Sequence, residues 1–157
     1  MESKTNDEWN PEIFATYWIN YASRLIQSRF EKVLRPLGFG LPYVGVATEL
    51  AKSGPLLQRD LAKRYGVEQP TMAALLTRME RDGLVSRKPH PEDKRASLVS
   101  LTAKAKSRLP EVKQRLAKEA REFTDGLSDP ETKMLTSLLR KVVKSLDEDD
   151  ALTKSSS

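Results

Sequence analysis

Residues 59–102 constrain the fold more than any other part of the chain. Their order of structural signals is helix, tight turn, helix, strand, charged hairpin and strand. Gly66 stops the first helix where a residue must take a positive φ angle, and Gly83 closes the second. Pro70 stands near the start of the second helix, where its missing backbone N–H costs nothing. This order is typical of a winged helix-turn-helix, in which the hairpin forms the wing.

The second helix of this pair divides its side chains between two faces. Met72, Leu75, Leu76 and Met79 recur at intervals of three and four residues and predict a buried face. The opposite face carries short or hydrogen-bonding side chains and one long cation, which suit a groove better than a protein core. These candidate groove residues are Gln69, Thr71, Ala74, Thr77 and Arg78.

The hairpin that follows is too polar to fold inward and too long for a two-residue turn. One strand begins at Leu84–Val85, its partner covers residues 96–101, and the loop between them should project as a wing. The alternative is an ordinary solvated hairpin, in which surface ion pairs contribute little. The candidate contact residues of such a wing are Lys88, His90, Asp93, Lys94 and Arg95.

Two short motifs in this region carry a family resemblance. Residues 79–85, MERDGLV, stand where one bacterial family has Leu-Glu-x-x-Gly-Leu-Val at the end of its recognition helix. The same family has Asp-x-Arg in its wing and Val-x-Leu-Thr at the strand end, matched here by Asp93, Arg95, Val99, Leu101 and Thr102. The chain therefore resembles the multiple-antibiotic-resistance regulator (MarR) family of winged-helix repressors. Ala105 replaces a glycine that the family usually has at a helix start.

The resemblance implies a homodimeric regulator that binds a palindromic double-stranded DNA operator, most simply as a repressor. It also implies that Asp93 pairs with Arg95 and directs the guanidinium into the minor groove, where narrow A/T-rich stretches strengthen the negative potential. Many family members bind aromatic carboxylates or phenols between their dimerisation helices and the DNA-binding lobe. Candidate effector residues here are Tyr17, Tyr21, Arg24 and Tyr43, for which core or dimer packing is the alternative.

The segments outside the winged helix carry more apolar surface than one chain can hide. Asn10 as a cap and Pro11 as a first helical residue, with Trp9 and Phe14 closing over them, predict the start of a long helix. Apolar residues from Leu109 onward, and again after the helix start at residues 128–131, predict two closing helices. In a two-fold dimer, two recognition helices would lie roughly 34 Å apart, as successive major grooves require.

The expected fold class is mainly α with a small β-hairpin wing: a winged helix-turn-helix core flanked by long N- and C-terminal dimerisation helices. The expected segments are a flexible N-terminus (1–8), an N-terminal dimerisation helix (9–35), a winged helix-turn-helix DNA-binding lobe (36–102), C-terminal dimerisation helices (103–147) and a disordered tail (148–157).

Composition agrees with a small regulator that binds a polyanion. The formal net charge is +5, and residues 101–121 alone carry seven Lys/Arg against two Asp/Glu. A solvated helix face is the alternative for this second cluster, although Lys104 and Lys106 could touch phosphate. No apolar run approaches the roughly 20 residues of a membrane span, and the first ten residues lack the features of a signal peptide, so we expect a cytoplasmic protein.

Several classes of function are excluded or disfavoured by the residues themselves. With no cysteine and one histidine, the chain has no disulfide framework, thiolate metal site or cysteine redox switch, and no cofactor is expected. Because no nucleophile and base stand in a catalytic arrangement, we do not expect an enzyme. The remaining alternative is a winged-helix protein-interaction module without sequence-specific DNA binding.

Overall fold

Helices make up most of the described chain, and three short strands form one sheet. The computed structural model describes residues 9–93 and 95–155, with side chains as far as residue 147. The chain divides into two compact units, Met1–Glu119 and Ala120–Ser157. In the first unit the elements are 3-10 turns at Pro11–Ile13 and Arg35–Leu37, α1 (Ala15–Leu34), α2 (Leu41–Ser53), β1 (Leu56–Leu57), α3 (Gln58–Tyr65), α4 (Gln69–Arg81), β2 (Val85–Pro89), β3 (Ser97–Leu101) and most of α5 (Ala103–Glu122).

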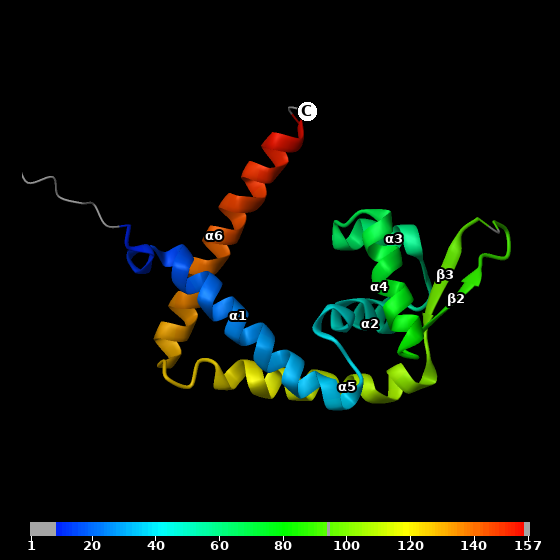
Figure 1. Ribbon diagram of the computed structural model, residues 1–157, viewed down its shortest axis with the longest axis horizontal. Coiled ribbons are helices and arrows are strands. Elements are labelled where there is room, and N and C mark those ends of the chain that lie inside the picture. Colours follow the sequence, from blue (N-terminus) through cyan, green and yellow to red (C-terminus); the bar gives the residue numbers. More distant parts are fainter. Residues whose placement is uncertain (1–8, 94, 156–157) are drawn as a thin grey trace, which may run out of the picture. The chain divides into compact units, whose positions relative to one another are not determined.

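The sheet has the strand order β1-β3-β2, with both pairings antiparallel. Val85 pairs with Leu101 and Pro89 with Ser97, so β2 and β3 form the predicted hairpin, which extends beyond the body of the lobe (Figure 1). The two-residue strand β1 pairs with β3 through Leu56 and Val99. The mainly helical, winged fold class is confirmed.

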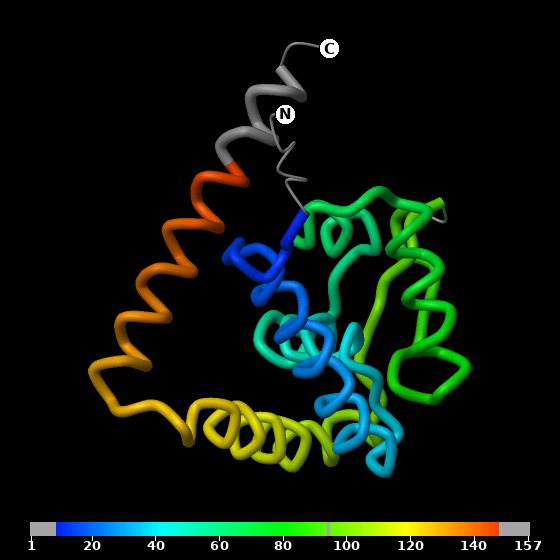
Figure 2. The backbone as a smooth tube through the Cα atoms, turned by 60° about the vertical axis from the view of Figure 1, so that its left-hand side comes forward, coloured from blue at the N-terminus to red at the C-terminus, as the bar shows by residue number. Residues whose placement is uncertain are grey.

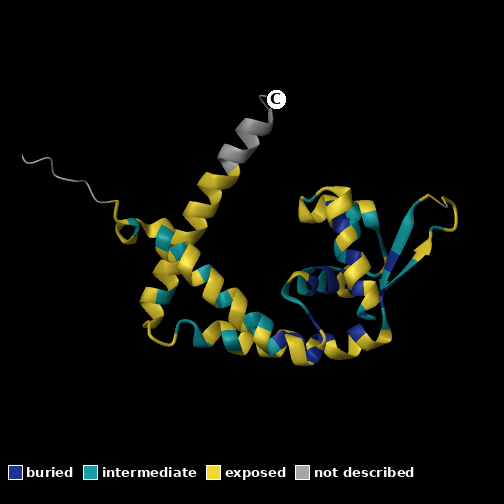
Figure 3. Ribbon diagram, in the orientation of Figure 1, coloured by how far each residue is buried: buried dark blue, intermediate teal, exposed yellow. Residues whose placement is uncertain are grey.

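The core lies inside the winged lobe. Leu61 of α3 and Leu76 and Met79 of α4 have no exposed surface, and α5 adds Ala105 and Val112, which are equally buried. Figure 3 shows these buried positions in dark blue on α2, α3, α4 and the first half of α5. Because Ala105 is in the core, the family glycine is replaced here by a side chain that contributes apolar packing.

Two glycines end the paired helices as expected. Gly66 has a φ of 60° and Gly83 a φ of 72°, in the left-handed region that side chains rarely adopt. At Gly66 the backbone N–H donates to the Lys63 carbonyl at 3.2 Å, and the Val67 N–H donates to the Ala62 carbonyl at 3.1 Å. These bonds satisfy the last carbonyls of α3 and turn the chain into α4.

The start of the first long helix differs from the prediction. Asn10 Oδ1 does accept the Glu12 N–H at 3.1 Å, and the rings of Trp9 and Phe14 stack at 5.3 Å. However, this cap belongs to a single 3-10 turn, and α1 begins only at Ala15 because Phe14 is extended, with φ −96° and ψ 131°. The Trp18 Nε1–H donates to the Glu12 carbonyl at 2.8 Å and holds the separate turn in place. In the view of Figure 2 this turn leads into the blue α1.

The second unit contains the end of α5 and helix α6 (Asp129–Ser155). The Ser128 hydroxyl and N–H both donate to Glu131 Oε2, at 2.7 and 2.8 Å, which confirms the predicted helix start. The tail predicted to be disordered from residue 148 instead continues the helical backbone to Ser155, because residues 148–155 contain no glycine or proline that would end it. Residues 1–8 and 156–157, the rest of the predicted flexible ends, lie outside the described residues.

Helices in the described part of the chain are too short or too polar to cross a membrane.

Candidate nucleic-acid interface

Helix α4 presents one buried face and one exposed face. Met72, Leu76 and Met79 are at most 1% exposed and pack into the core. The predicted groove residues lie on the other side. All five are exposed on that side of the helix: Gln69, Thr71, Ala74, Thr77 and Arg78. The helix therefore presents an amide and a guanidinium on a face that packing leaves open.

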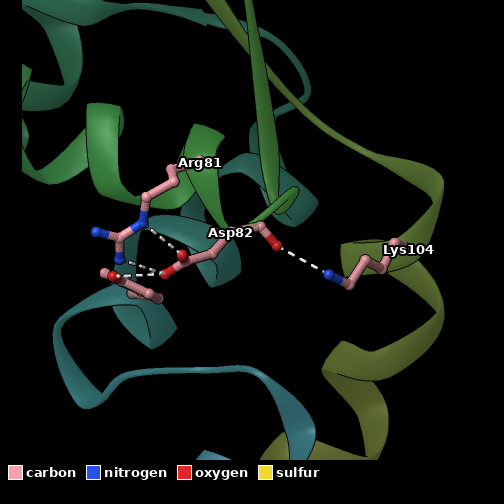
Figure 4. A network of polar contacts seen from close by, with 4 residues as sticks. Arg81, Asp82 and Lys104 are labelled. Atoms are coloured by element: carbon pink, nitrogen blue, oxygen red, sulfur yellow. Dashed lines mark hydrogen bonds and ion pairs between the residues drawn. The ribbon is translucent and has the colours of Figure 1, made fainter.

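The C-terminal end of α4 is held by a network that sequence reasoning did not predict. The Tyr43 hydroxyl donates to Asp82 Oδ2 at 3.0 Å, and Arg81 Nε donates to Asp82 Oδ1 at 2.9 Å. From α5, Lys104 Nζ donates to the Asp82 carbonyl at 2.8 Å, as Figure 4 shows. Thr102 adds a bond from its hydroxyl to the Gly83 carbonyl at 2.7 Å. The end of α4 is thus fixed to both α2 and the start of α5.

Hydrogen bonding and burial in this network shift two pKa values in opposite directions. The hydrogen bond from Arg81 lowers the pKa of the Asp82 carboxyl, and the hydrogen bond from Tyr43 lowers it by a smaller amount. Burial, reinforced by the hydrogen bond to Asp82, raises the pKa of the Tyr43 hydroxyl. Both shifts keep a neutral tyrosine donating to an ionised aspartate, the arrangement that the distance requires.

A second cluster joins the wing to the exposed face of α4. Arg87 on β2 donates from Nε and Nη2 to Glu80 Oε2 at 3.0 and 2.8 Å, and from Nη2 to Thr77 Oγ1 at 3.1 Å. The bond from Arg87 lowers the pKa of Glu80. Neither Arg87 nor Glu80 was a predicted site residue, because the contact depends on how β2 returns beside α4.

The structure contradicts the side-chain pairing inferred for Asp93 and Arg95 in the wing. Asp93 Oδ1 accepts the backbone N–H of Arg95 at 3.0 Å, and no ion pair joins the two described side chains. A short carboxylate two residues before an amide closes a local turn more easily than it reaches a long guanidinium. Asp93 therefore shapes the wing backbone, and the Arg95 side chain is exposed.

The other three wing candidates differ in their surroundings. Lys88 is exposed on β2, opposite Leu98. His90 is half-buried, and its Nδ1 accepts the Glu92 N–H at 3.2 Å, so part of its hydrogen-bonding capacity serves the loop. Lys94 lies outside the described residues.

A polar hollow lies between the loop of the wing and the starts of α3 and α4. It encloses about 290 Å³ and brings together Asp93, Arg95 and Gln69, which were predicted from separate motifs. Gln58 and Arg59 on the first turn of α3 also line it, and sequence reasoning missed both. Gln58 and Arg59 lie near the predicted DNA contacts because the loop of the wing folds toward α3, which no local pattern encodes.

Comparisons with known proteins show the family of the chain. Residues 48–97 match the MarR family. The HTH-type transcriptional regulator YwoH of Bacillus subtilis is 30% identical over 122 residues, which cover 78% of this chain and 88% of YwoH. The chain belongs to the MarR family.

Solved structures of MarR-family proteins have the same fold. A mutant of Escherichia coli MarR complexed with operator DNA is 26% identical, with a TM-score of 0.71 over 83% of this chain and 95% of that one. A MarR-like transcription regulator from Bacillus cereus is 29% identical, with a TM-score of 0.70 over 82% of this chain and 92% of that one. The transcriptional repressor CouR, bound to a 23-mer DNA duplex, shares the fold at 22% identity, with a TM-score of 0.73 over 91% and 99% of the two chains.

This MarR-family protein is a DNA-binding transcriptional regulator, and members of the family are regulators rather than enzymes. That finding favours DNA as the partner of the winged helix over the protein-interaction alternative.

Of the four candidate effector residues in this MarR-family chain, three lie together. The rings of Tyr17 and Tyr21 on α1 stack at 6.3 Å with an interplanar angle of 1°, and Arg24 Cζ lies 5.5 Å from the centre of the Tyr21 ring. Tyr43 instead is buried at the start of α2, where it contacts Asp82. The structure does not bring Tyr43 into the α1 cluster. Tyr17 and Tyr21 lie in the first half of α1, whereas Tyr43 lies in α2, which follows the other end of α1.

Proposed function

We propose that this MarR-family regulator is a homodimeric repressor that reads a palindromic operator and is released by a small aromatic or phenolic effector. The observation that carries the proposal is the exposed polar face of α4, opposite a fully buried apolar face. A helix held this firmly can enter a major groove without losing its own packing.

Readout of bases is assigned to the exposed face of α4. Gln69 matches the edge of adenine and Arg78 that of guanine, and each such bidentate pair contributes about 1–3 kcal/mol of discrimination. Thr71, Ala74 and Thr77 supply shorter hydroxyl and methyl contacts. In the wing, Arg95 enters the minor groove, while Lys88, His90 and Lys94 lie along the backbone and Asp93 holds the loop.

Dimerisation is supported by large apolar side chains that are exposed in the single chain. In the first unit they include Trp9, Ile13, Phe14, Trp18, Tyr21 and Leu25. In the second they are Leu127, Met134, Leu135, Leu138, Leu139, Val142, Val143 and Leu146. Patches of this kind mark interaction surfaces on soluble proteins, and a second copy of the chain is the occupant that a two-fold operator requires.

Repression and its release complete the proposal. CouR is by its name a repressor, and we extend that role to this chain. The stacked Tyr17 and Tyr21 with Arg24 offer aromatic faces and a cation to an aromatic anion. Tyr43 takes part through Asp82 and the end of α4. Such a ligand releases DNA only if it binds the DNA-free arrangement more tightly than the DNA-bound one.

The direct test is footprinting on the DNA that flanks the protein's own gene. We expect two protected half-sites about one helical turn, roughly 34 Å, apart. Affinity should fall steeply as salt rises, because Lys and Arg contacts release counterions from phosphate. A footprint with one half-site, or binding insensitive to salt, would contradict the proposal.

A further inference from the structure

Arg87 is held rigidly beside the exposed face of α4. Besides the two guanidinium bonds to Glu80 Oε2, its backbone N–H donates to Glu80 Oε1 at 3.3 Å, so both oxygens of this carboxylate hold Arg87. The Arg87 side chain is only 25% exposed. Several charge-assisted bonds to one carboxylate give the guanidinium a defined direction that an isolated surface ion pair lacks.

That direction leads to Thr77, whose Oγ1 accepts Nη2–H at 3.1 Å. A threonine hydroxyl has one hydrogen to donate and two lone pairs with which to accept. In a helix the hydroxyl often donates to the carbonyl one turn back, as Thr136 does to Thr132 at 2.9 Å on α6. Among the described residues Thr77 makes no such bond. With a cation occupying a lone pair, its hydrogen is left for a partner outside the chain.

We propose that Arg87 is a positioning residue for sequence recognition, which turns the Thr77 hydroxyl into a donor toward the major groove. Thr77 would then select a base that presents an acceptor there over cytosine, whose amino group donates; guanine and thymine match it best, because adenine places an amino donor beside its N7 acceptor. The inference rests on the proposed function, because it requires the exposed face of α4 to enter the groove. It goes further by assigning a base class to one position and a cause to that preference.

Selection from random-sequence double-stranded DNA tests this directly. Full-length wild type, Thr77→Val and Arg87→Met are each used to enrich bound oligonucleotides, and base frequencies are compared position by position. Valine keeps the shape of threonine without its hydroxyl, and methionine keeps the length of the arginine stem without its donors. Arg115→Met is the matched control, because Arg115 also donates from Nε and Nη2 to one glutamate, Glu111, at 3.0 and 2.8 Å, but on α5.

The wild type should favour guanine or thymine over cytosine at one position per half-site by about ten-fold, the usual scale of a single mismatch. Thr77→Val and Arg87→Met should both bring that ratio close to one and leave the other positions unchanged, and combining them should add nothing further. Arg115→Met should keep the wild-type ratio. Arg87→Lys keeps the charge but cannot bond both Glu80 and Thr77, so it should behave like Arg87→Met. It replaces Arg87→Met in the experiment if that variant unfolds at a much lower temperature than the wild type.

Two results would overturn the inference and leave the proposed function intact. One is an unchanged base ratio in the two Arg87 variants while Thr77→Val loses it. The other is a uniform loss of affinity on all sequences with a salt slope lower by about one, which would make Arg87 a phosphate contact. If the wild type enriches no sequence at all, the proposed function itself fails together with this inference.

Discussion

The Tyr43 hydroxyl, buried at the start of α2, donates a 3.0 Å hydrogen bond to Asp82 at the end of α4. The bond links two helices through residues that are 39 positions apart in the sequence. It thereby sets where α4, the proposed recognition helix, ends relative to α2, and a change at Tyr43 should affect DNA binding as well as stability.

Removing this hydroxyl should cost stability and affinity together. Tyr43→Phe keeps the ring in the core but loses one hydrogen bond, which lowers the free energy of unfolding by about 1 kcal/mol. Urea unfolding followed by circular dichroism measures that loss. Leu61→Val, a core change on α3 that leaves Tyr43 and Asp82 in place, is the control. If Tyr43→Phe binds operator DNA as the wild type does, the bond has no role in positioning α4.

Direct readout by Arg78 should appear as a loss of specificity. Arg78→Ala should weaken binding to the footprinted operator by roughly ten-fold or more while changing binding to random DNA far less, because a bidentate guanine contact contributes about 1–3 kcal/mol. Gel shifts with both DNAs give the ratio. An equal loss on the two DNAs would make Arg78 a phosphate contact.

Asp93 and Arg95 have separate roles in the wing: Asp93 holds the loop backbone, and the exposed Arg95 side chain is the proposed DNA contact. Arg95→Ala should abolish most operator binding with little change in melting temperature, because the side chain is exposed. Asp93→Ala should weaken binding more mildly, and Asp93→Asn should restore it, since an amide oxygen can still accept the Arg95 N–H. Gel shifts and thermal unfolding of the three variants measure both effects. Failure of Asp93→Asn to rescue would show that the negative charge, rather than the turn, is what matters.

Features that depend on residues close together in the sequence could be predicted, whereas contacts between distant segments could not. The two faces of α4 follow from a repeat of three and four residues within one helix, so Met72 and Thr77 were assigned correctly to the buried and exposed sides. Arg59 was missed because its hollow is built from segments far apart in the chain. Asp93 was given the wrong partner because two acceptable hydrogen bonds, to a backbone amide or to a guanidinium, differ only in the geometry of the turn.

The apolar face of α6 should control the oligomeric state. Leu138→Glu places a charge on this face and should give monomers in light scattering after gel filtration, because a buried charge without a partner is strongly unfavourable at an interface. Ser137→Glu adds the same charge at the adjacent position, among the polar residues Thr136, Arg140 and Lys141, and should remain dimeric. Dimers in both variants would place the interface elsewhere.

Release by an effector should depend on the cluster of Tyr17, Tyr21 and Arg24. Titrating salicylate-like compounds should change tryptophan fluorescence, because Trp18 contacts Tyr17 edge to face at 5.1 Å, and should release DNA over the same concentration range. Arg24→Ala should shift both curves to higher concentration, since the cation that pairs with the anion is lost. Lys32→Ala, which removes a cation near the other end of α1, should shift neither. Aromatic anions are tested up to roughly millimolar concentration, which detects binding free energies of about −4 kcal/mol or more favourable. If none of them alters either signal, the three residues pack at an interface instead.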